Sequence, residues 1–149
     1  MLQINKILFP CDLTENLPKI LPYALSIAGK YNSTINLLHV IDDNPHKWGI
    51  PPYYSLTLDK QELLKGAEKA MEKVCEEQLQ GCPNFTRKIT FGNPADEILK
   101  TIETESVDLV IMGTHGRQGL DHAIFGSVAE KVIRKSPAPV LIINPYKLK

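Results

Sequence analysis

The sequence predicts an α/β protein: a Rossmann-like doubly wound sheet of five parallel strands with helices on both faces. Short, nearly continuous apolar runs alternate along the chain with segments whose apolar residues recur at helical spacing, and a final apolar run closes the pattern. Strands that are buried on both faces have this continuous apolar character, and right-handed crossovers then distribute the helices over both faces. For 149 residues we expect a single domain, residues 1–149, that buries about 70% of the surface of the unfolded chain.

The first half of the chain supplies two buried strands and two helices. The strands are "INKILFP" (4–10) and "TINLLHVI" (34–41). The helix between them has Pro18 in its first turn, whereas Pro22 removes an internal hydrogen bond and predicts a kink or a late helix start. After a long loop, residues 42–59, the second helix presents one largely apolar side, formed by Leu63, Ala67, Ala70, Met71, Val74 and Gln78.

The second half supplies three strands and two helices. "TRKITF" (86–91) alternates polar and apolar residues, which is typical of a strand at the edge of a sheet. Asn93 is expected to cap a helix with Pro94 at its first position, and "VDLVIM" (107–112) is the next buried strand. A last helix then leads to the final strand, "PVLIIN" (139–144).

Composition argues against several classes of partner. Lys and Arg together number 17, as do Asp and Glu, so no net field draws the chain to nucleic acid or to a membrane. No apolar run approaches the roughly 18 residues of a membrane span, and Asp12 arrives before a signal-length apolar run develops. The three cysteines form neither a CxxC pair nor a zinc pattern. We therefore expect a cytoplasmic protein with reduced thiols.

A glycine-rich segment gives the strongest functional indication. Residues 113–127, "GTHGRQGLDHAIFGS", contain four glycines in fifteen positions. Parallel sheets bind ligands at the carboxyl ends of their strands, where the chain order reverses. There Gly113 would allow close backbone approach, Gly116 could turn N–H groups toward an anion, and Gly126–Ser127 would begin a helix whose first N–H groups are unpaired. The segment therefore predicts a phosphate site.

Two better-known phosphate loops do not match this segment. No lysine follows its final glycine, and it contains no GxG pair. Arg117 could add a charge-assisted contact to a phosphate, and "FPCDLT" (9–14), which ends the first strand, is expected at the same edge of the sheet. A flexible surface loop is the competing interpretation of the glycines.

The full spacing Gly113-x2-Gly116-x9-Gly126-Ser127 resembles the ATP-binding pattern Gx2Gx9G[ST] of the universal stress protein family. The resemblance extends over five segments in the same order, of which the last two carry the pattern itself: "ILFPCDLTENL", "LLHVID", "FGNPADEIL", "DLVIMGTHGR" and "FGSVAEKVIRKSPAPVLII". The resemblance implies a five-stranded parallel sheet that holds ATP at its carboxyl edge, and a homodimer paired through the last strand. It leaves open whether Mg²⁺ or Mn²⁺ accompanies the nucleotide, and whether ADP or AMP is preferred.

The resemblance also implies individual ligand contacts. Asp12 would meet the ribose hydroxyls or a phosphate-bound metal, the alternative being that it only caps the following helix. Val40 would present backbone groups to the adenine edge, the alternative being a core valine. The remaining positions match or flank the phosphate-binding pattern: Met112, Gly113, Gly116, Gly126, Ser127 and Val128. With Glu130, Ser127 also spells a capping box, and we expect Ser127 to bind phosphate while Glu130 points away.

Other candidate residues have simpler interpretations. His39 lies within an apolar strand and is expected to be a hydrogen-bonded core histidine. Cys11 stands where the family is expected to have valine or threonine, and no neighbouring cation lowers its pKa, so we expect it to pack in the core. The loop 42–59 carries Trp48, Tyr53 and Tyr54, which could cover the adenine or face a partner; both interpretations stay open.

Three functions are compatible with these features. The favoured one is a binding protein whose ATP acts as a signalling or regulatory state. A slow ATPase or nucleotidyl-transfer enzyme is the second, but it would need a group that positions water and a cation at the leaving phosphates. No base or essential lysine stands out. A nucleotide-free interaction module is the third, and the intact glycine spacing argues against it.

Overall fold

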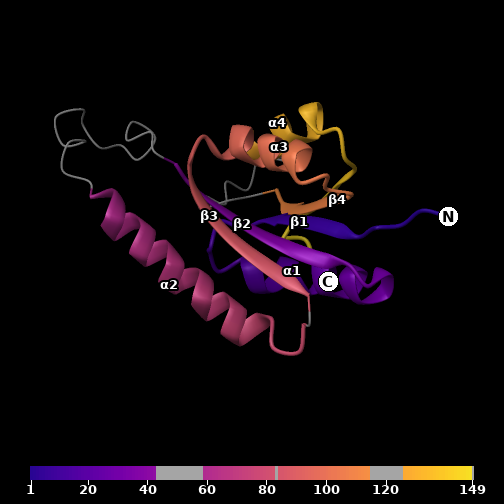
Figure 1. Ribbon diagram of the computed structural model, residues 1–149, viewed down its shortest axis with the longest axis horizontal. Coiled ribbons are helices and arrows are strands. Elements are labelled where there is room, and N and C mark those ends of the chain that lie inside the picture. Colours follow the sequence, from indigo (N-terminus) through magenta and orange to yellow (C-terminus); the bar gives the residue numbers. More distant parts are fainter. Residues whose placement is uncertain (43–58, 83, 115–125, 149) are drawn as a thin grey trace.

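The computed structural model describes residues 1–42, 59–82, 84–114 and 126–148. Its strands form one sheet whose order is β3-β2-β1-β4-β5, and all four neighbouring pairs are parallel (Figure 1). The strands are β1 (Lys6–Pro10), β2 (Thr34–Asp42), β3 (Phe85–Gly92), β4 (Leu109–Gly113) and β5 (Val140–Ile143). The predicted doubly wound sheet of five parallel strands is thereby confirmed.

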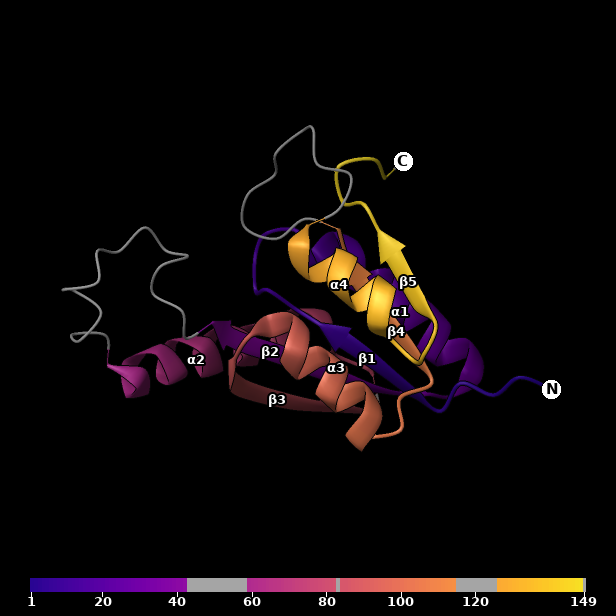
Figure 2. The ribbon, with the colours of Figure 1, turned by 90° about the horizontal axis from the view of Figure 1, so that it is seen from above.

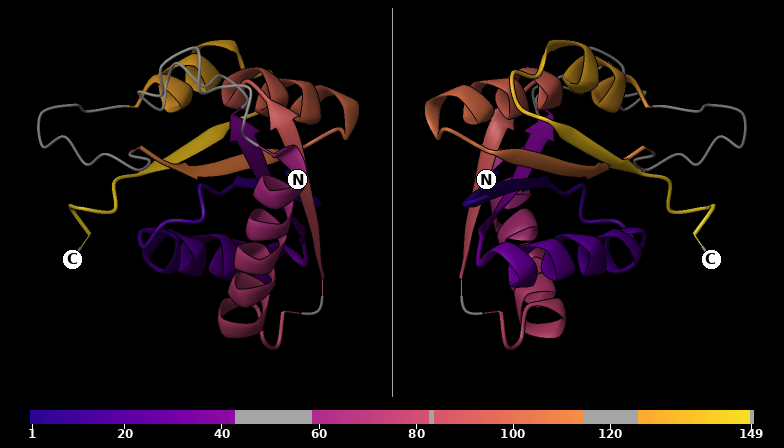
Figure 3. Two further views of the ribbon diagram at one scale, coloured as in Figure 1. Left: turned by 90° about the vertical axis from the view of Figure 1, so that its left-hand side faces the viewer. Right: turned by 90° about the vertical axis from the view of Figure 1, so that its right-hand side faces the viewer.

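The helices cover the two faces of the sheet in pairs. They are α1 (Leu17–Tyr31), α2 (Lys60–Gln78), α3 (Pro94–Thr104) and α4 (Ser127–Lys135). Viewed from the two sides, α3 and α4 lie above the sheet and α1 and α2 below it (Figure 3). From above, α3 and α4 run next to each other on the near face (Figure 2).

Each face of the sheet packs its own hydrophobic core. Beneath the sheet, Ile7, Phe9 and Ile35 pack against Leu21 of α1 and Met71 of α2. Above it, the buried side chains come from both strands and helices: Leu8, Leu38, Val110, Met112, Ala95, Ile98, Ile102, Ala129 and Val132. Successive strand residues thus serve opposite cores, as the period of two requires.

The proline in the middle of α1 does not delay the helix. The helix begins at Leu17, before Pro22, so the predicted late start is wrong. Pro22 lacks the N–H that would bond to the carbonyl of Pro18 one turn earlier, and both prolines are exposed. Water can therefore solvate that carbonyl, which limits the cost of the missing bond. Asn32 ends the helix in the left-handed conformation, with φ of 57°.

The edge positions in the sheet follow the sequence pattern. The alternating strand β3 lies at one edge, as predicted, and its exposed residues include Thr86, Arg87 and Lys88.

The predicted apolar side of α2 is buried only in part. Met71 on that side is buried, while Leu63 on the same side remains 39% exposed. None of the helices in the described ranges has the length and apolar character needed to cross a membrane.

Candidate functional site

The chain order reverses between β1 and β4, and the described residues of both candidate segments adjoin the carboxyl ends of these strands. β1 pairs with β2 on one side and with β4 on the other, so its neighbours belong to the two halves of the chain. Beyond β1 the chain enters α1 at Leu17, and α4 begins at Ser127 after the segment that follows β4. This switch point is where parallel α/β sheets form their ligand crevice.

Asp12 directly follows β1 in a tight turn. Its Oδ1 accepts hydrogen bonds from the Thr14 N–H at 3.0 Å and from the Thr14 hydroxyl at 2.7 Å. The N-cap of α1 is Asn16, which makes no side-chain capping bond, so the alternative that Asp12 caps this helix is wrong. Within the turn, between Asp12 and Thr14, Leu13 adopts φ of 60°, a left-handed conformation that is costly for a leucine.

The backbone of Val40 extends past the end of β1. In β2, Leu38 turns its backbone groups toward β1, because its carbonyl accepts the N–H of Cys11 at 2.9 Å. Val40 lies two residues further and therefore faces the same way. Pairing with β1 ends at Pro10 and Leu38, and within the described residues the bond from the Cys11 N–H to the Leu38 carbonyl is the last backbone hydrogen bond between these strands.

The side chain of Val40 has a separate role from its backbone. It is half-buried and packs against the core above the sheet. The interpretation of Val40 as a core valine is therefore correct for the side chain. The N–H and carbonyl groups on the β1 side are nonetheless placed where a ligand could bond to them.

The two described glycines of the Gx2Gx9G[ST] pattern are closely approached by the rest of the chain, Gly113 by the end of a side chain and Gly126 by the backbone. A Cβ on Gly113 would lie 2.5 Å from Cδ1 of Ile20, a buried residue of α1. A Cβ on Gly126 would lie 2.8 Å from the backbone oxygen of Thr114. Gly126 has φ of −70°, so close approach and not unusual backbone conformation requires glycine there. The expectation that Gly113 leaves room for a ligand needs this correction: the space on its Cβ side is filled by Ile20.

A short bridge closes the base of the glycine-rich segment. The Gly126 N–H donates to the Thr114 carbonyl at 2.7 Å, and the Thr114 N–H donates to the Ile143 carbonyl of β5 at 3.0 Å. The amide of Gly126 is therefore used within the chain. Gly116 and Arg117, together with Trp48, Tyr53 and Tyr54 of the long loop, lie outside the described residues.

The first turn of α4 carries amides that the helix itself does not use. Ser127 is the first helical residue and Gly126 is the N-cap, with no side-chain capping bond. The alternative interpretation as a capping box is thus wrong, and, as expected, Glu130 does not turn back to the helix start: its carboxylate pairs with Arg134 one turn later. The first turn of any helix lacks intrahelical acceptors for its N–H groups, here those of Ser127, Val128 and Ala129. With the positive end of the helix dipole, these amides form a site suited to an anion.

The residues that flank the loop pattern differ in burial. Met112 is only 5% exposed and packs in the core above the sheet, so its side chain does not line a ligand site. Val128 is half-buried and packs at the margin of the same core, while Ser127 is exposed. Of these three residues, Ser127 is the one whose side chain is open to solvent at the start of α4.

His39 and Cys11 are structural, as predicted. Nδ1 of His39 lies 2.7 Å from the Cys11 carbonyl, and the histidine is buried. The Cys11 thiol packs in the lower core, 3.6 Å from the Leu38 carbonyl. Burial raises the pKa of the Cys11 thiol, and the negative charge of Asp12 raises it further, so the thiol stays protonated. Together these contacts tie the end of β1 to β2.

Sequence reasoning assigned no ligand-related role to Thr14, Asn16 or Tyr146. Asn16 is 3% exposed, and its side-chain amide donates to the Tyr146 hydroxyl at 3.1 Å. The spacing Asp-x-Thr is a local indication of a side-chain-to-backbone turn. The contact with Tyr146 spans 130 residues and has no comparable indication in the sequence. In the part of the chain that the structure describes, no group of three or more His, Cys, Asp or Glu side chains could hold a metal ion.

The fold and its switch point place this chain among Rossmann-like α/β proteins, a class whose ligand sites lie at the carboxyl edge of the sheet. Comparison with known proteins narrows the class. The model of the Universal stress protein family matches residues 3–144. The chain therefore belongs to the universal stress protein family.

Individual relatives agree with this assignment. The universal stress protein MJ0577 of Methanocaldococcus jannaschii is 33% identical over 155 residues, which cover 94% of each chain. The solved structure of MJ0577 matches the present structure with a TM-score of 0.76, and the match covers 96% of this chain and 97% of that one. The universal stress protein UspA from Lactobacillus plantarum is 23% identical, with a TM-score of 0.80 over 97% of this chain and 100% of that one. A universal stress protein from Archaeoglobus fulgidus, solved in complex with dAMP, is 14% identical with a TM-score of 0.68, over 97% of this chain and 100% of that one.

Proposed function

We propose that this universal stress protein binds an adenine nucleotide, ATP, at the carboxyl edge of its sheet and uses the bound nucleotide as a regulatory state. The observation that carries the proposal is the start of α4. The amides of Ser127, Val128 and Ala129 have no acceptor within the helix, and the Thr114–Gly126 bridge fixes where they lie. A phosphate group is the natural ligand for such amides.

The other two parts of a nucleotide have proposed partners along the same edge. Val40 would bond to the adenine edge through its backbone, which extends past the end of β1. Asp12 would accept hydrogen bonds from the ribose hydroxyls, since one of its oxygens is held by Thr14 and the carboxylate is only half-buried. The proposal assigns phosphate contacts also to Gly113, Gly116 and Arg117, and backbone contacts to Met112. Gly126 would border the phosphate without donating its N–H, which bonds to the Thr114 carbonyl.

The family supports this assignment of ligand class. The similar protein from Archaeoglobus fulgidus was solved with dAMP, an adenine nucleotide. Magnesium or manganese would enter with the phosphates, and no residue of the chain is assigned as a ligand of the metal.

We further propose that the protein is cytoplasmic and forms a homodimer. The cytoplasmic location is supported by the free thiols of Cys11, Cys75 and Cys82. The homodimer is supported by the edge strand β5 with its exposed Leu141.

The test is direct. Purified protein is denatured, and any released nucleotide is identified by chromatography; stripped protein is then titrated with ATP while its melting temperature is followed. We expect an adenine nucleotide in the supernatant and a melting temperature that rises with ATP concentration. If neither is seen, the chain is an interaction module without nucleotide. Multiple-turnover phosphate release that is lost in Asp12→Ala would instead favour a slow ATPase.

A further inference from the structure

A chain of hydrogen bonds fixes the carboxylate of Asp12 from behind. Oδ1 accepts two bonds from Thr14, one from its hydroxyl at 2.7 Å and one from its N–H at 3.0 Å. The Thr14 hydroxyl itself accepts the Asn16 N–H at 3.4 Å. Because that contact occupies a lone pair of the Thr14 hydroxyl, the hydroxyl proton points at Asp12. The hydroxyl group therefore has one preferred orientation.

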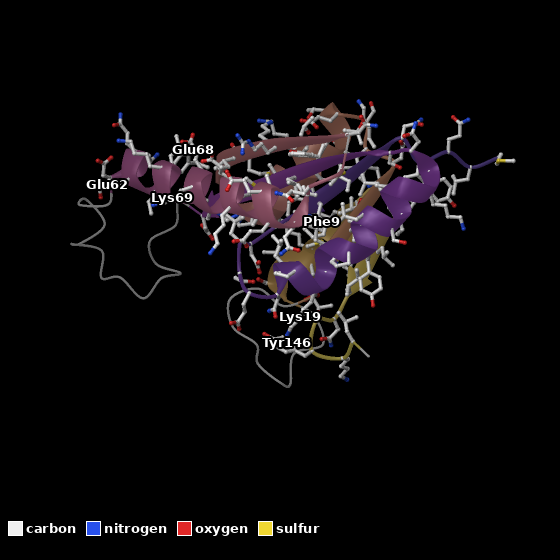
Figure 4. All side chains as sticks on the ribbon, turned by 90° about the horizontal axis from the view of Figure 1, so that it is seen from below. Phe9, Lys19, Glu62, Glu68, Lys69 and Tyr146 are labelled. Carbon is white, nitrogen blue, oxygen red and sulfur yellow. The ribbon has the colours of Figure 1, made fainter. Side chains whose placement is uncertain are left out.

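The base of this chain is anchored in buried structure. Asn16 is 3% exposed, and its side-chain amide bonds to the hydroxyl of Tyr146, which follows β5. Nζ of Lys19 lies 5.8 Å from the centroid of the Tyr146 ring, and the two side chains lie next to each other in the view from below (Figure 4). The tail after β5 thus holds the start of α1, and with it Thr14, in place.

The two oxygens of Asp12 are consequently unequal. Oδ1 is engaged twice by Thr14, whereas no hydrogen bond among the described residues engages Oδ2. An ionised carboxylate oxygen can accept two hydrogen bonds, which matches the two hydroxyls of a ribose. Without the two bonds from Thr14, the carboxylate of an aspartate rotates over a broad range about its terminal torsion. Fixing that rotation when the ligand binds would cost conformational entropy and lower the affinity.

We propose that Thr14 is a positioning residue that locks Asp12 so that Oδ2 alone is presented to the ribose diol, and that this lock sets the preference for ribonucleotides. The inference rests on the proposed nucleotide site. It adds that discrimination between a sugar with a diol and one without it depends on a hydroxyl that never touches the ligand.

The test compares the affinities of wild-type protein and three variants for ATP and for 2′,3′-dideoxy-ATP. Thr14→Val removes the hydroxyl at constant shape, Thr14→Ser keeps it, and Asp12→Ala removes the carboxylate. Wild-type protein and Thr14→Ser should bind ATP more tightly than the dideoxy ligand. Thr14→Val should lower the affinity for ATP about fivefold, as expected for the loss of one hydrogen bond, and should leave the affinity for the dideoxy ligand unchanged. Asp12→Ala should bind both ligands alike.

The possible failures are distinguishable. If wild-type protein binds ATP but Thr14→Val keeps the full preference for ATP, the lock plays no part, while the nucleotide site stands. If Thr14→Val weakens both ligands equally, Thr14 is merely structural and the inference is overturned. If wild-type protein binds neither ligand, the proposed function falls, and this inference falls with it. The melting temperature of each variant, together with Thr14→Ala as a second removal of the hydroxyl, separates a lost lock from a failure to fold.

Discussion

Gly126 and Thr114 meet backbone to backbone: the Gly126 N–H donates to the Thr114 carbonyl at 2.7 Å, and a Cβ on Gly126 would lie 2.8 Å from that same oxygen. The oxygen belongs to the main chain, so it cannot swing aside as the end of a side chain could. The contact closes the segment between β4 and α4 and sets where α4 begins. Glycine at this position therefore serves the closure of the loop, and through it the orientation of the helix start.

Gly126→Ala should consequently cost both stability and nucleotide affinity. The added methyl must push the two ends of the loop apart, and overpacking of this kind costs about 1–3 kcal/mol. Chemical denaturation measures the first effect and calorimetric titration with ATP the second. Gly29→Ala is the matched control, because a Cβ there meets no atom within 4 Å; it should be neutral or should stabilise the helix. Equal behaviour of the two variants would contradict the role given to Gly126.

Ser127→Asp should move stability and binding in opposite directions. A carboxylate at the first position of α4 interacts favourably with the helix dipole and should stabilise the protein by about 0.3–1 kcal/mol. The same charge repels a phosphate from the amides of Ser127, Val128 and Ala129, so ATP affinity should fall about tenfold. Thermal melting and ATP titration measure the two effects, with Ser127→Ala as the uncharged control. Unchanged affinity in Ser127→Asp would mean that the phosphates do not bind at this helix start.

Asp96 and Lys131 give a pH-dependent link between α3 and α4. The hydrogen bond from Lys131, with the charges of Lys131 and Lys135, lowers the pKa of the Asp96 carboxyl. A pKa that is lower in the folded state stabilises the protein above the unfolded-state pKa of about 3.9, and the contribution disappears as the pH falls through the folded value. NMR titration should show the Asp96 pKa rising in Lys131→Met. No rise in this variant would mean that the contact is not populated in solution.

The strand β5 should carry the dimer contact. It is an edge strand, with no further strand on its outer side among the described residues, and Leu141 on it is 38% exposed. Leu141→Lys should convert the proposed homodimer into a monomer, as measured by size-exclusion chromatography with light scattering. Leu63→Lys is the control, since Leu63 on α2 is exposed to a similar 39%. If wild-type protein is already monomeric, or if Leu63→Lys dissociates it equally, the interface is not at β5.

The overall arrangement of the elements could be predicted because it depends on patterns that the sequence displays directly. Apolar runs mark the buried strands, and the alternation at 86–91 marks an edge strand, which β3 is. The switch point follows from right-handed crossovers, which leave few topologies. These are statements about burial and chain direction, and both are visible without coordinates.

The details of the candidate site were harder to predict because each depends on distances between segments that are remote in sequence. Ser127 and Glu130 also spelled a capping box as an alternative, yet the helix begins one residue earlier than that alternative requires, and Gly126 is the N-cap. Gly113 looked like an opening for a ligand, yet Ile20 fills the space beside it. The contact between Asn16 and Tyr146 depends on where the tail after β5 lies, which is a consequence of the complete fold.

The measurement that tests the central claim most directly is an NMR titration of the stripped protein with ATP, followed through its backbone amide signals. The amides of Ser127, Val128 and Ala129, and that of Val40 across the edge, should shift in a saturable way, while those of Lys60 to Gln78 in α2 should not. Shifts confined to other parts of the molecule, or none at saturating ATP, would contradict a nucleotide held at the start of α4.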